Sequence, residues 1–184
     1  MQGVDLHTHS NISDGTYSPE LLVQAALEKG IHTLALTDHD SMDGLLLAEK
    51  VAKNQPIQII SGVEISSQWS RPSTNKSYGV HIVALNMQNL DPLNRLLEQQ
   101  KRIRAVRAKQ ICDLLTPLIH MDIYPDVLSK VDGEPDRITR THIAKTLVEK
   151  GIVARPQQAF DQYIKEGKKA YVKFDGLGLA ETIE

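Results

Sequence analysis

The sequence contains a single cysteine, Cys112, among its 184 residues. An internal disulfide is therefore impossible, and nothing in the cysteine content requires an oxidising compartment. No stretch approaches the roughly 20 consecutive apolar residues that cross a bilayer. These two absences predict a globular, cytoplasmic protein that does not enter a membrane.

Aromatic residues are also scarce, at 4% of the chain with one tryptophan, so stacking on exposed bases is a poor candidate for the main binding mode. Net charge is only −2, which gives no general attraction to nucleic acid, although a local basic patch could still bind it. The 41% hydrophobic content suffices for one sizeable core. No feature of the sequence points to a protein partner.

Strand and helix patterns alternate in the first half of the chain. The segments "VDLHTH", "IHTLALT", "IQIISGVEIS" and "GVHIVALN" are expected strands, and "SQWSRPSTNKS" is an expected polar turn region between the last two. "SPELLVQAALEKG" and "DGLLLAEKVAKN" are expected helices. Ser18 and Pro19 occupy the cap and first helical position of the former, as in a well-defined helix start. The alternation predicts an α/β fold with parallel strands.

The pattern becomes helical from Asp91 onward. One long helix is expected over 91–119, and shorter ones near "YPDVLSKV", "TRTHIAKTLVEKG" and "RPQQAFDQYIKEG". We therefore expect residues 1–91 to form the first part of the α/β domain and residues 92–168 a helical insertion that acts as a lid. Residues 169–184 are expected to return to the α/β layer through a strand at "AYVKF" and a helix at "GLAETIE".

Two histidines end the first expected strand. His7 and His9 are two residues apart, so in a strand they project from the same face. Asp14 follows in the next loop, where Gly15 permits a tight turn. One His-x-His pair alone is weak evidence for a metal, because structural histidines are common.

The next three strands each add a histidine or a carboxylate. Asp38, His39 and Asp40 follow the second strand, Glu64 lies at the end of the third, and His81 lies in the fourth. A carboxylate in the apolar setting of Glu64 is costly unless it is paired or bound to a cation. Four successive strands that bring such groups to one rim of a sheet predict a metal cluster there.

The motifs "DLHTHSNISDG", "LALTDHD", "GVEIS" and "HIVAL" resemble, in order and spacing, the PHP domain, a family named for polymerase and histidinol phosphatase. The resemblance covers residues 3–86. It implies a distorted (β/α)7 barrel, incomplete in this chain, that holds two or three divalent metal ions. The ligands that it implies are His7, His9, Asp14, His39, Glu64 and His81.

The family also uses three later ligands, a histidine or cysteine and then an Asp-x-His pair, beyond the equivalent of Glu184. The resemblance therefore implies that this chain is a piece of a longer protein and is inactive by itself. The pattern is most similar to stand-alone phosphoesterases of the family. These act on nucleoside 3′,5′-bisphosphates or on RNA 5′ ends.

Mixed imidazole and carboxylate ligands favour Mn, Zn or Fe ions over Mg²⁺ or Ca²⁺. Such ions can share a water, and attack of the resulting metal-bound hydroxide on phosphorus needs no serine or cysteine nucleophile. Glu64 has two oxygens with which to bridge two ions. We assign His39, Glu64 and Asp38 to catalysis, with Asp38 and Asp40 as outer or substrate-side groups.

The expected activity is hydrolysis of nucleotide phosphate esters, either as a nucleoside 3′,5′-bisphosphate 3′-phosphatase, as a 5′→3′ exoribonuclease on short RNA, or as both. A histidinol-phosphate-type phosphatase and a non-catalytic metal-binding PHP module are the alternatives. Metal-dependent C–N hydrolysis is a third, although similar barrels that perform it usually need a carboxylated lysine or another ligand order.

Basic residues in the helical segment suit a small nucleotide or a short RNA. Arg140 and His142 lie at an expected helix N-terminus, a natural anion site. Lys168 and Tyr171 lie where the chain returns to the α/β layer, and we assign all four to substrate binding. The run "KRIRAVRAK" is open to two interpretations: the solvated face of a long helix, or a funnel for an anionic substrate.

Overall fold

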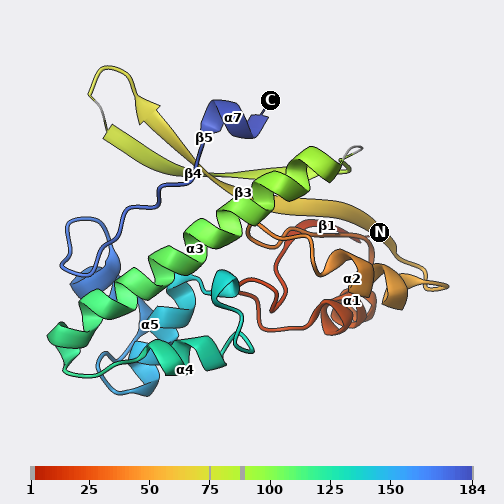
Figure 1. The fold of residues 1–184 in the computed structure, drawn as a ribbon. Helices are drawn as coiled ribbons and strands as arrows, with labels where there is room; N and C mark the ends of the chain where they lie inside the picture. The colour runs from red at the N-terminus through yellow and green to blue at the C-terminus, as the bar shows by residue number, and fades with distance from the viewer. Residues whose placement is uncertain (1–2, 75, 88–89, 184) are drawn as a thin grey trace. The chain divides into compact units, whose positions relative to one another are not determined.

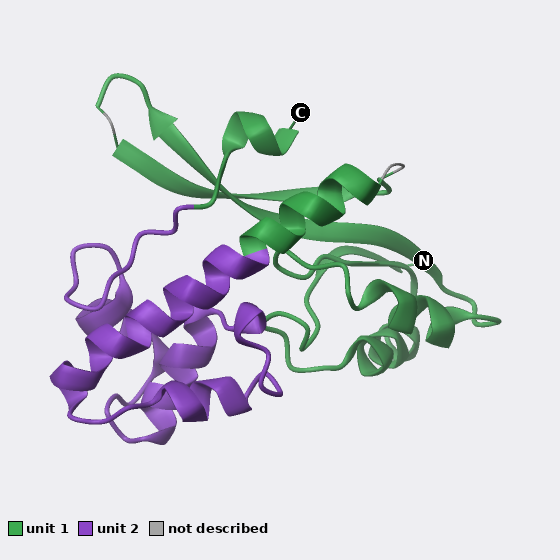
Figure 2. Cartoon of the chain, viewed as in Figure 1, with its two compact units in different colours: residues 1–100, 176–184 green, residues 101–175 purple. Residues whose placement is uncertain are grey.

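The computed structural model describes residues 3–74, 76–87 and 90–183 of the chain (Figure 1). The chain divides into two compact units, of which unit 1 comprises residues 1–100 and 176–184 and unit 2 comprises residues 101–175 (Figure 2). The α/β class is confirmed, with the sheet in unit 1. Unit 2 is helical and overlaps most of the insertion expected over 92–168.

The sheet of unit 1 has the strand order β1-β2-β3-β4, and the two-residue strand β5 pairs with β3. β1, β2 and β3 are parallel, as the alternating pattern predicted, and β5 also runs parallel to β3. The strands are β1 (Gly3–Thr8), β2 (Ile31–Leu36), β3 (Gln58–Arg71), β4 (Lys76–Leu85) and β5 (Leu177–Gly178).

The prediction of a parallel fourth strand is wrong, because β4 runs antiparallel to β3. β3 ends at Arg71 and β4 begins at Lys76, and this connection is far too short for the crossover that parallel strands need. The expected polar turn region is also mostly strand: Trp69 lies directly opposite Tyr78, with the ring centroids 5.8 Å apart. The two strands therefore form one long hairpin.

Helices α1 (Pro19–Glu28) and α2 (Leu45–Ala52) confirm the two helices expected between the first strands. Ser18 caps α1 as predicted, because its hydroxyl accepts a hydrogen bond from the backbone N–H of Leu21 at 3.3 Å. Both helices pack with β2 in one apolar cluster. The fully or nearly fully buried members of this cluster include Val23, Ala26, Leu34, Leu36 and Ala48.

Helix α3 (Leu90–Ile119) confirms the expected long helix; it begins in unit 1 and ends in unit 2. Unit 2 contains four further short helical elements and a π-helical turn, where the sequence predicted shorter helices. They are α4 (Tyr124–Ser129), η1 (Pro135–Arg137), α5 (Arg140–Glu149), α6 (Pro156–Ala159) and η2 (Phe160–Ile164).

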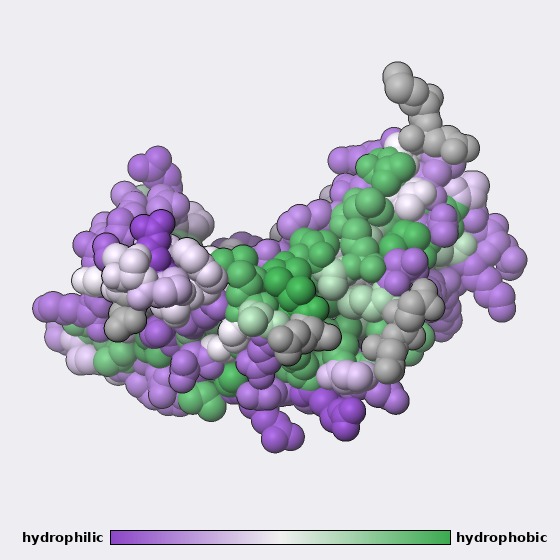
Figure 3. Space-filling model, turned by 90° about the horizontal axis from the view of Figure 1, so that it is seen from above, coloured by the Kyte–Doolittle hydropathy of each residue, from purple (hydrophilic) through white to green (hydrophobic). Residues whose placement is uncertain are grey.

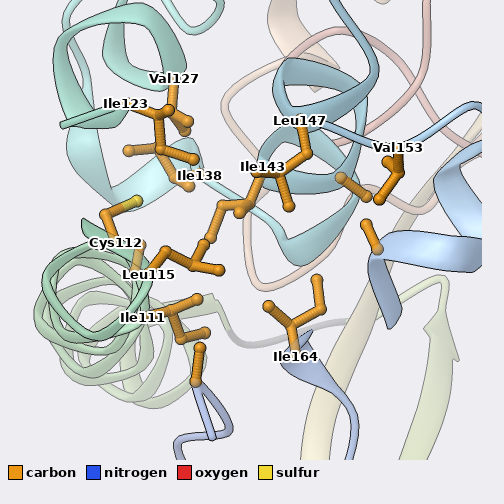
Figure 4. Close-up of a cluster of buried hydrophobic side chains, with 14 of the residues drawn as sticks. Ile111, Cys112, Leu115, Ile123, Val127, Ile138, Ile143, Leu147, Val153 and Ile164 are labelled. Atoms are coloured by element: carbon orange, nitrogen blue, oxygen red, sulfur yellow. The ribbon is translucent and has the colours of Figure 1, made fainter. Parts of the chain in front are cut away.

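A separate hydrophobic core stabilises unit 2 (Figure 4). One face of α3 contributes Ile111 and Leu115, and α5 contributes Ile143 and Leu147. All four are at most 1% exposed. Because this cluster is built entirely from residues 108–170, unit 2 buries its own apolar surface.

The strand expected at "AYVKF" is wrong, since residues 171–176 have no regular secondary structure. The backbone carbonyl of Val172 accepts its hydrogen bond from the Arg107 side chain at 2.9 Å, and not from a neighbouring strand. The chain then forms only β5 before helix α7 (Leu179–Ile183), which confirms the helix expected at "GLAETIE". A side chain has thus taken the acceptor that a strand partner would use.

Some apolar side chains of unit 1 are exposed. Val4 and Leu6, on the edge strand β1, are 60% and 38% exposed, and Ile183 of α7 is 70% exposed. The space-filling view shows apolar residues gathered on the face turned to the viewer, with hydrophilic residues around them (Figure 3). Even so, in the part of the chain that the structure describes, no helix combines the length and apolar character needed to cross a bilayer.

Burial determines the reactivity of Cys112, which is 0% exposed in the core of unit 2. Desolvation raises the pKa of its thiol to about 12, so the thiol stays protonated at neutral pH. We expect a thiol-specific reagent to modify native protein at pH 8 at least about 100-fold more slowly than protein unfolded in guanidinium. Equal rates, followed by absorbance or mass, would contradict the burial of this side chain.

Candidate metal centre

The parallel arrangement of β1 and β2 brings the segments that follow them together. His7 lies in β1 and His9 directly after it, while His39 follows β2. His39 also forms a parallel bridge with Glu64 of β3. In this bridge the Glu64 N–H donates to the Asp38 carbonyl at 3.2 Å, and the Asp40 N–H donates to the Glu64 carbonyl at 3.0 Å. Glu64 therefore lies in the middle of β3, level with the end of β2, and not at the end of its own strand.

The carboxylate of Glu64 lies among four imidazoles. Its Oε2 atom is 3.0 Å from His7 Nε2 and 2.9 Å from His9 Nε2. The same oxygen is 3.7 Å from His39 Nδ1, and Oε1 is 2.6 Å from His81 Nδ1. Residues from the first four strands thus meet at one carboxylate.

Asp14 approaches the same group from the β1–α1 loop. Its Oδ1 atom is 3.5 Å from His9 Nδ1 and 4.0 Å from His39 Nε2. Gly15 is required here by close approach of the backbone: a Cβ at this position would lie 2.2 Å from the His9 carbonyl oxygen and 2.8 Å from that of Ser10. A larger residue would therefore displace the loop that positions Asp14.

Three groups of side chains could each hold a metal ion, since their ligand atoms lie within 4.8 Å of one another. Each pair of groups shares one residue, and together they contain the six predicted ligands. The groups are His7, His9 and Glu64; His9, Asp14 and His39; and His39, Glu64 and His81.

The electrostatic environment keeps Glu64 ionised. Burial, which leaves the residue 6% exposed, acts to raise the pKa of its carboxyl group. The hydrogen bond from His7 and the nearby imidazoles of His39 and His81 outweigh burial, so the pKa is lowered overall. His7 and His81 are half exposed, with side-chain accessibilities of 55% and 50%. The group is therefore open to solvent on the side of these two histidines.

Asp38 is buried beneath the β1–α1 loop and 1% exposed. Its Oδ1 atom accepts hydrogen bonds from the Ser10 backbone N–H at 2.7 Å and from the Ser13 hydroxyl at 2.6 Å. Its Oδ2 atom accepts one from the Ser10 hydroxyl at 2.7 Å. Ser13 Oγ in turn lies 3.3 Å from His9 Nδ1. This geometry gives Asp38 a positioning role, and its assignment to catalysis stays a prediction.

Asp40 plays a similar part on the other side of the group. It is 1% exposed and has a φ of 51°, a left-handed conformation that aspartate tolerates better than most residues. Its Oδ1 atom accepts a hydrogen bond from the Ser66 N–H at 2.7 Å. Since Ser66 lies directly opposite His81 in the hairpin, this contact fixes β3 at the level of that histidine.

The four residues assigned to substrate binding all lie in unit 2. Arg140 is the first residue of α5 and is half-buried. His142 is buried, and its Nδ1 accepts a hydrogen bond from the Thr139 N–H at 3.1 Å, so that part of its function is to cap the helix. Lys168 is exposed and Tyr171 is half-buried. Their assignment to substrate binding stays a prediction.

Arg107 was not singled out from the basic run, but it is half-buried in unit 2. A signal was available in the helical period. Arg107 lies four residues after Ile103 and four before Ile111, which is 1% exposed. A cation on the apolar face of a helix differs from its solvated neighbours, and it stood apart from the rest of the run on that ground.

Comparison with known proteins identifies similar chains. The model of the PHP domain family matches residues 5–174. A 5′-3′ exoribonuclease of Haemophilus influenzae is 40% identical over 181 residues, which cover 98% of this chain and 63% of that protein. A 3′,5′-nucleoside bisphosphate phosphatase of Chromobacterium violaceum is 33% identical over 184 residues, or 100% of this chain and 62% of that protein. The chain thus spans about three fifths of the length of these relatives.

Solved structures agree with the sequence comparison. An amidohydrolase from Chromobacterium violaceum with bound sulfate and no metal superposes with a TM-score of 0.88 at 32% identity, over 98% of this chain and 62% of that chain. A candidate metal-dependent phosphoesterase from Bifidobacterium adolescentis gives a TM-score of 0.85 at 28% identity, over 99% of this chain and 62% of that chain.

The position of Asp38 generates a prediction. Replacing it with alanine leaves three donors of the loop without an acceptor, so we expect a loss of about 1–3 kcal/mol in the free energy of unfolding. Because Ser13 contacts His9, Mn²⁺ affinity should also fall on the order of 10-fold. Urea unfolding and metal titration measure the two effects. The control is Glu49→Gln, which changes an exposed carboxylate of α2; equal effects of both variants would exclude the positioning role.

Proposed function

The chain belongs to the PHP-domain family, and from this premise we propose that it forms part of a metal-dependent phosphoesterase that hydrolyses phosphate esters of nucleotides. The observation that carries the proposal is the convergence of four imidazoles and the Asp14 carboxylate around Glu64. Since the chain spans about three fifths of its curated relatives, the activity proposed is that of the whole protein.

The donor set fits divalent metal ions. Imidazole nitrogen with carboxylate oxygen is typical of Mn, Zn or Fe sites. A neutral imidazole has one lone pair for a metal, whereas a carboxylate offers two oxygens. His9 and His39 can therefore each serve one ion, while Glu64 can serve two. The two groups that share Glu64 can be filled at the same time, which supports two ions, and a third would draw on Asp14.

When bound, such ions lower the pKa of a shared water toward neutrality and neutralise charge on phosphate oxygens. The residues of the chain prepare this arrangement. Glu64 is held ionised by its imidazole neighbours, and Asp38 and Asp40 fix the segments that carry His9 and His39. The exposed faces of His7 and His81 leave room for a phosphate ester to approach.

The substrate class follows from chemistry and from the relatives. One relative is named as an exoribonuclease and another as a nucleoside bisphosphate phosphatase, and both names specify nucleotide phosphate esters. We propose the same class here, with Arg140, His142, Lys168 and Tyr171 in contact with a phosphate that is not hydrolysed. These names do not favour the histidinol-phosphate alternative or a non-catalytic module. We also propose a cytoplasmic location, on the ground of the single, buried cysteine.

Removing a shared ligand should abolish the activity. In the full-length protein we expect Glu64→Gln or His39→Ala to lower kcat on a nucleoside 3′,5′-bisphosphate by at least about 1,000-fold, because each change disrupts two of the three groups. The matched control is His32→Ala, since His32 only contacts the carbonyl of Gly30, at 2.9 Å, at the start of β2. Metal content by elemental analysis should fall in the first two variants. Undiminished turnover by both would refute the proposal.

Arg140 should distinguish between substrates. We expect Arg140→Ala to raise KM for a nucleoside 3′,5′-bisphosphate about 10-fold or more and to leave KM for an aryl phosphate monoester unchanged, because the monoester has no second phosphate to bind. Steady-state kinetics on both substrates provide the measurement. Equal changes in the two KM values would remove Arg140 from the set of substrate contacts.

A further inference from the structure

Arg107 is held in one orientation within unit 2. Its Nε–H donates to the Val172 carbonyl at 2.9 Å, and its guanidinium carbon lies 5.4 Å from the centroid of the Phe174 ring. The hydrogen bond and the aromatic ring fix the plane of the guanidinium. Its terminal amino groups have no acceptor among the described residues. The edge of the guanidinium that binds oxyanions is therefore both oriented and unused.

Arg140 is held in a comparable way at the start of α5. Its guanidinium carbon lies 5.5 Å from the centroid of the Phe160 ring. The first helical N–H groups, those of Arg140 and Thr141, accept no partner in the segments that the structure describes. Unsatisfied N–H groups and the positive end of the helix dipole favour an anion at this point.

The two arginines interact electrostatically. Burial, followed by the charge of Arg140, lowers the pKa of Arg107 to about 10, while Tyr171 opposes the shift. Burial also lowers the pKa of Arg140, again opposed by Tyr171. No ion pair within the described part of the chain joins either arginine to a carboxylate. Two half-buried cations without a counter-ion are costly in themselves, and packing of their aliphatic stems alone does not require the charges to face one another.

We propose that Arg107 and Arg140, with the first N–H groups of α5, form a phosphate-binding site within unit 2. The site does not depend on the metal centre. Its identification with a phosphate of a nucleotide rests on the proposed function. Arg107, on α3, is then a specificity-determining residue, since it adds a second guanidinium to the one at the helix N-terminus.

A phosphate group matches this site better than a carboxylate does. Two guanidiniums balance a dianion, and the tetrahedral oxygens can accept hydrogen bonds from two planar donors and a helix N-terminus at once. A carboxylate has one charge and two coplanar oxygens, so it would leave one arginine uncompensated. The chemistry is that of a phosphate monoester or of inorganic phosphate, and both are included in the test.

The experiment is a titration of the metal-free protein in EDTA with inorganic phosphate and with adenosine 3′,5′-bisphosphate, followed by calorimetry. We expect both ligands to bind, and Arg107→Gln to raise their Kd at least about 10-fold. Arg107→Lys, which retains the charge and loses the fork, should weaken binding to an intermediate degree. The matched control is Arg95→Gln, which removes an exposed charge from the same helix, α3, and should leave Kd unchanged.

A second measurement applies even where the Arg107 variant fails to fold. In the wild-type protein, the ¹⁵N signal of the Arg107 Nε–H should move on addition of phosphate, and that of Arg95 should not. Phosphate binding that leaves the Arg107 signal in place, equal losses in the Arg107 and Arg95 variants, or no binding by the metal-free protein would each overturn the proposal. Should the metal-loaded full-length protein hydrolyse no phosphate ester while phosphate still binds through Arg107, the proposed function fails and the site stands.

Discussion

A carboxylate that is only 6% exposed is tolerated when other groups compensate its charge, and this constraint on Glu64 organises unit 1. Its two oxygens approach His7, His9 and His81 at 2.6–3.0 Å and His39 at 3.7 Å. Each histidine comes from a different turn of the chain, so the sheet must bring four segments to one point. The same groups that compensate the charge without a metal are the groups that suit a metal ion.

Compensation alone would not fix the geometry, because the segments after β1 and β2 have no regular structure. Two buried aspartates do so: Asp38 accepts hydrogen bonds from the loop after β1, and Asp40 accepts one from β3. Gly15 brings that loop against the backbone of His9. The ligands are thus held by a set of polar contacts that precede any metal, which is how preorganised metal sites are generally built.

The sequence was sufficient to predict which six side chains converge, because spacing within a strand and position after a parallel strand are local properties. It did not reveal the direction of β4, since "SQWSR" is too polar to be recognised as strand without its partner Tyr78. It also missed the role of Arg107. The hydrogen bond from Arg107 to Val172 joins residues 65 positions apart, and no local pattern announces such a contact; only the helical period of α3 marked this arginine as unusual.

The hairpin of β3 and β4 also bears on how the centre assembles as the protein folds. Glu64 and His81 are 17 positions apart and are joined by a short turn, whereas His7 and Glu64 are 57 positions apart. The entropy lost on closing a loop increases with its length. The carboxylate and its first imidazole can thus meet in a nascent hairpin, while the other imidazoles wait for β1 and β2 to dock. The order of events during folding is therefore written into the reversal of a single strand.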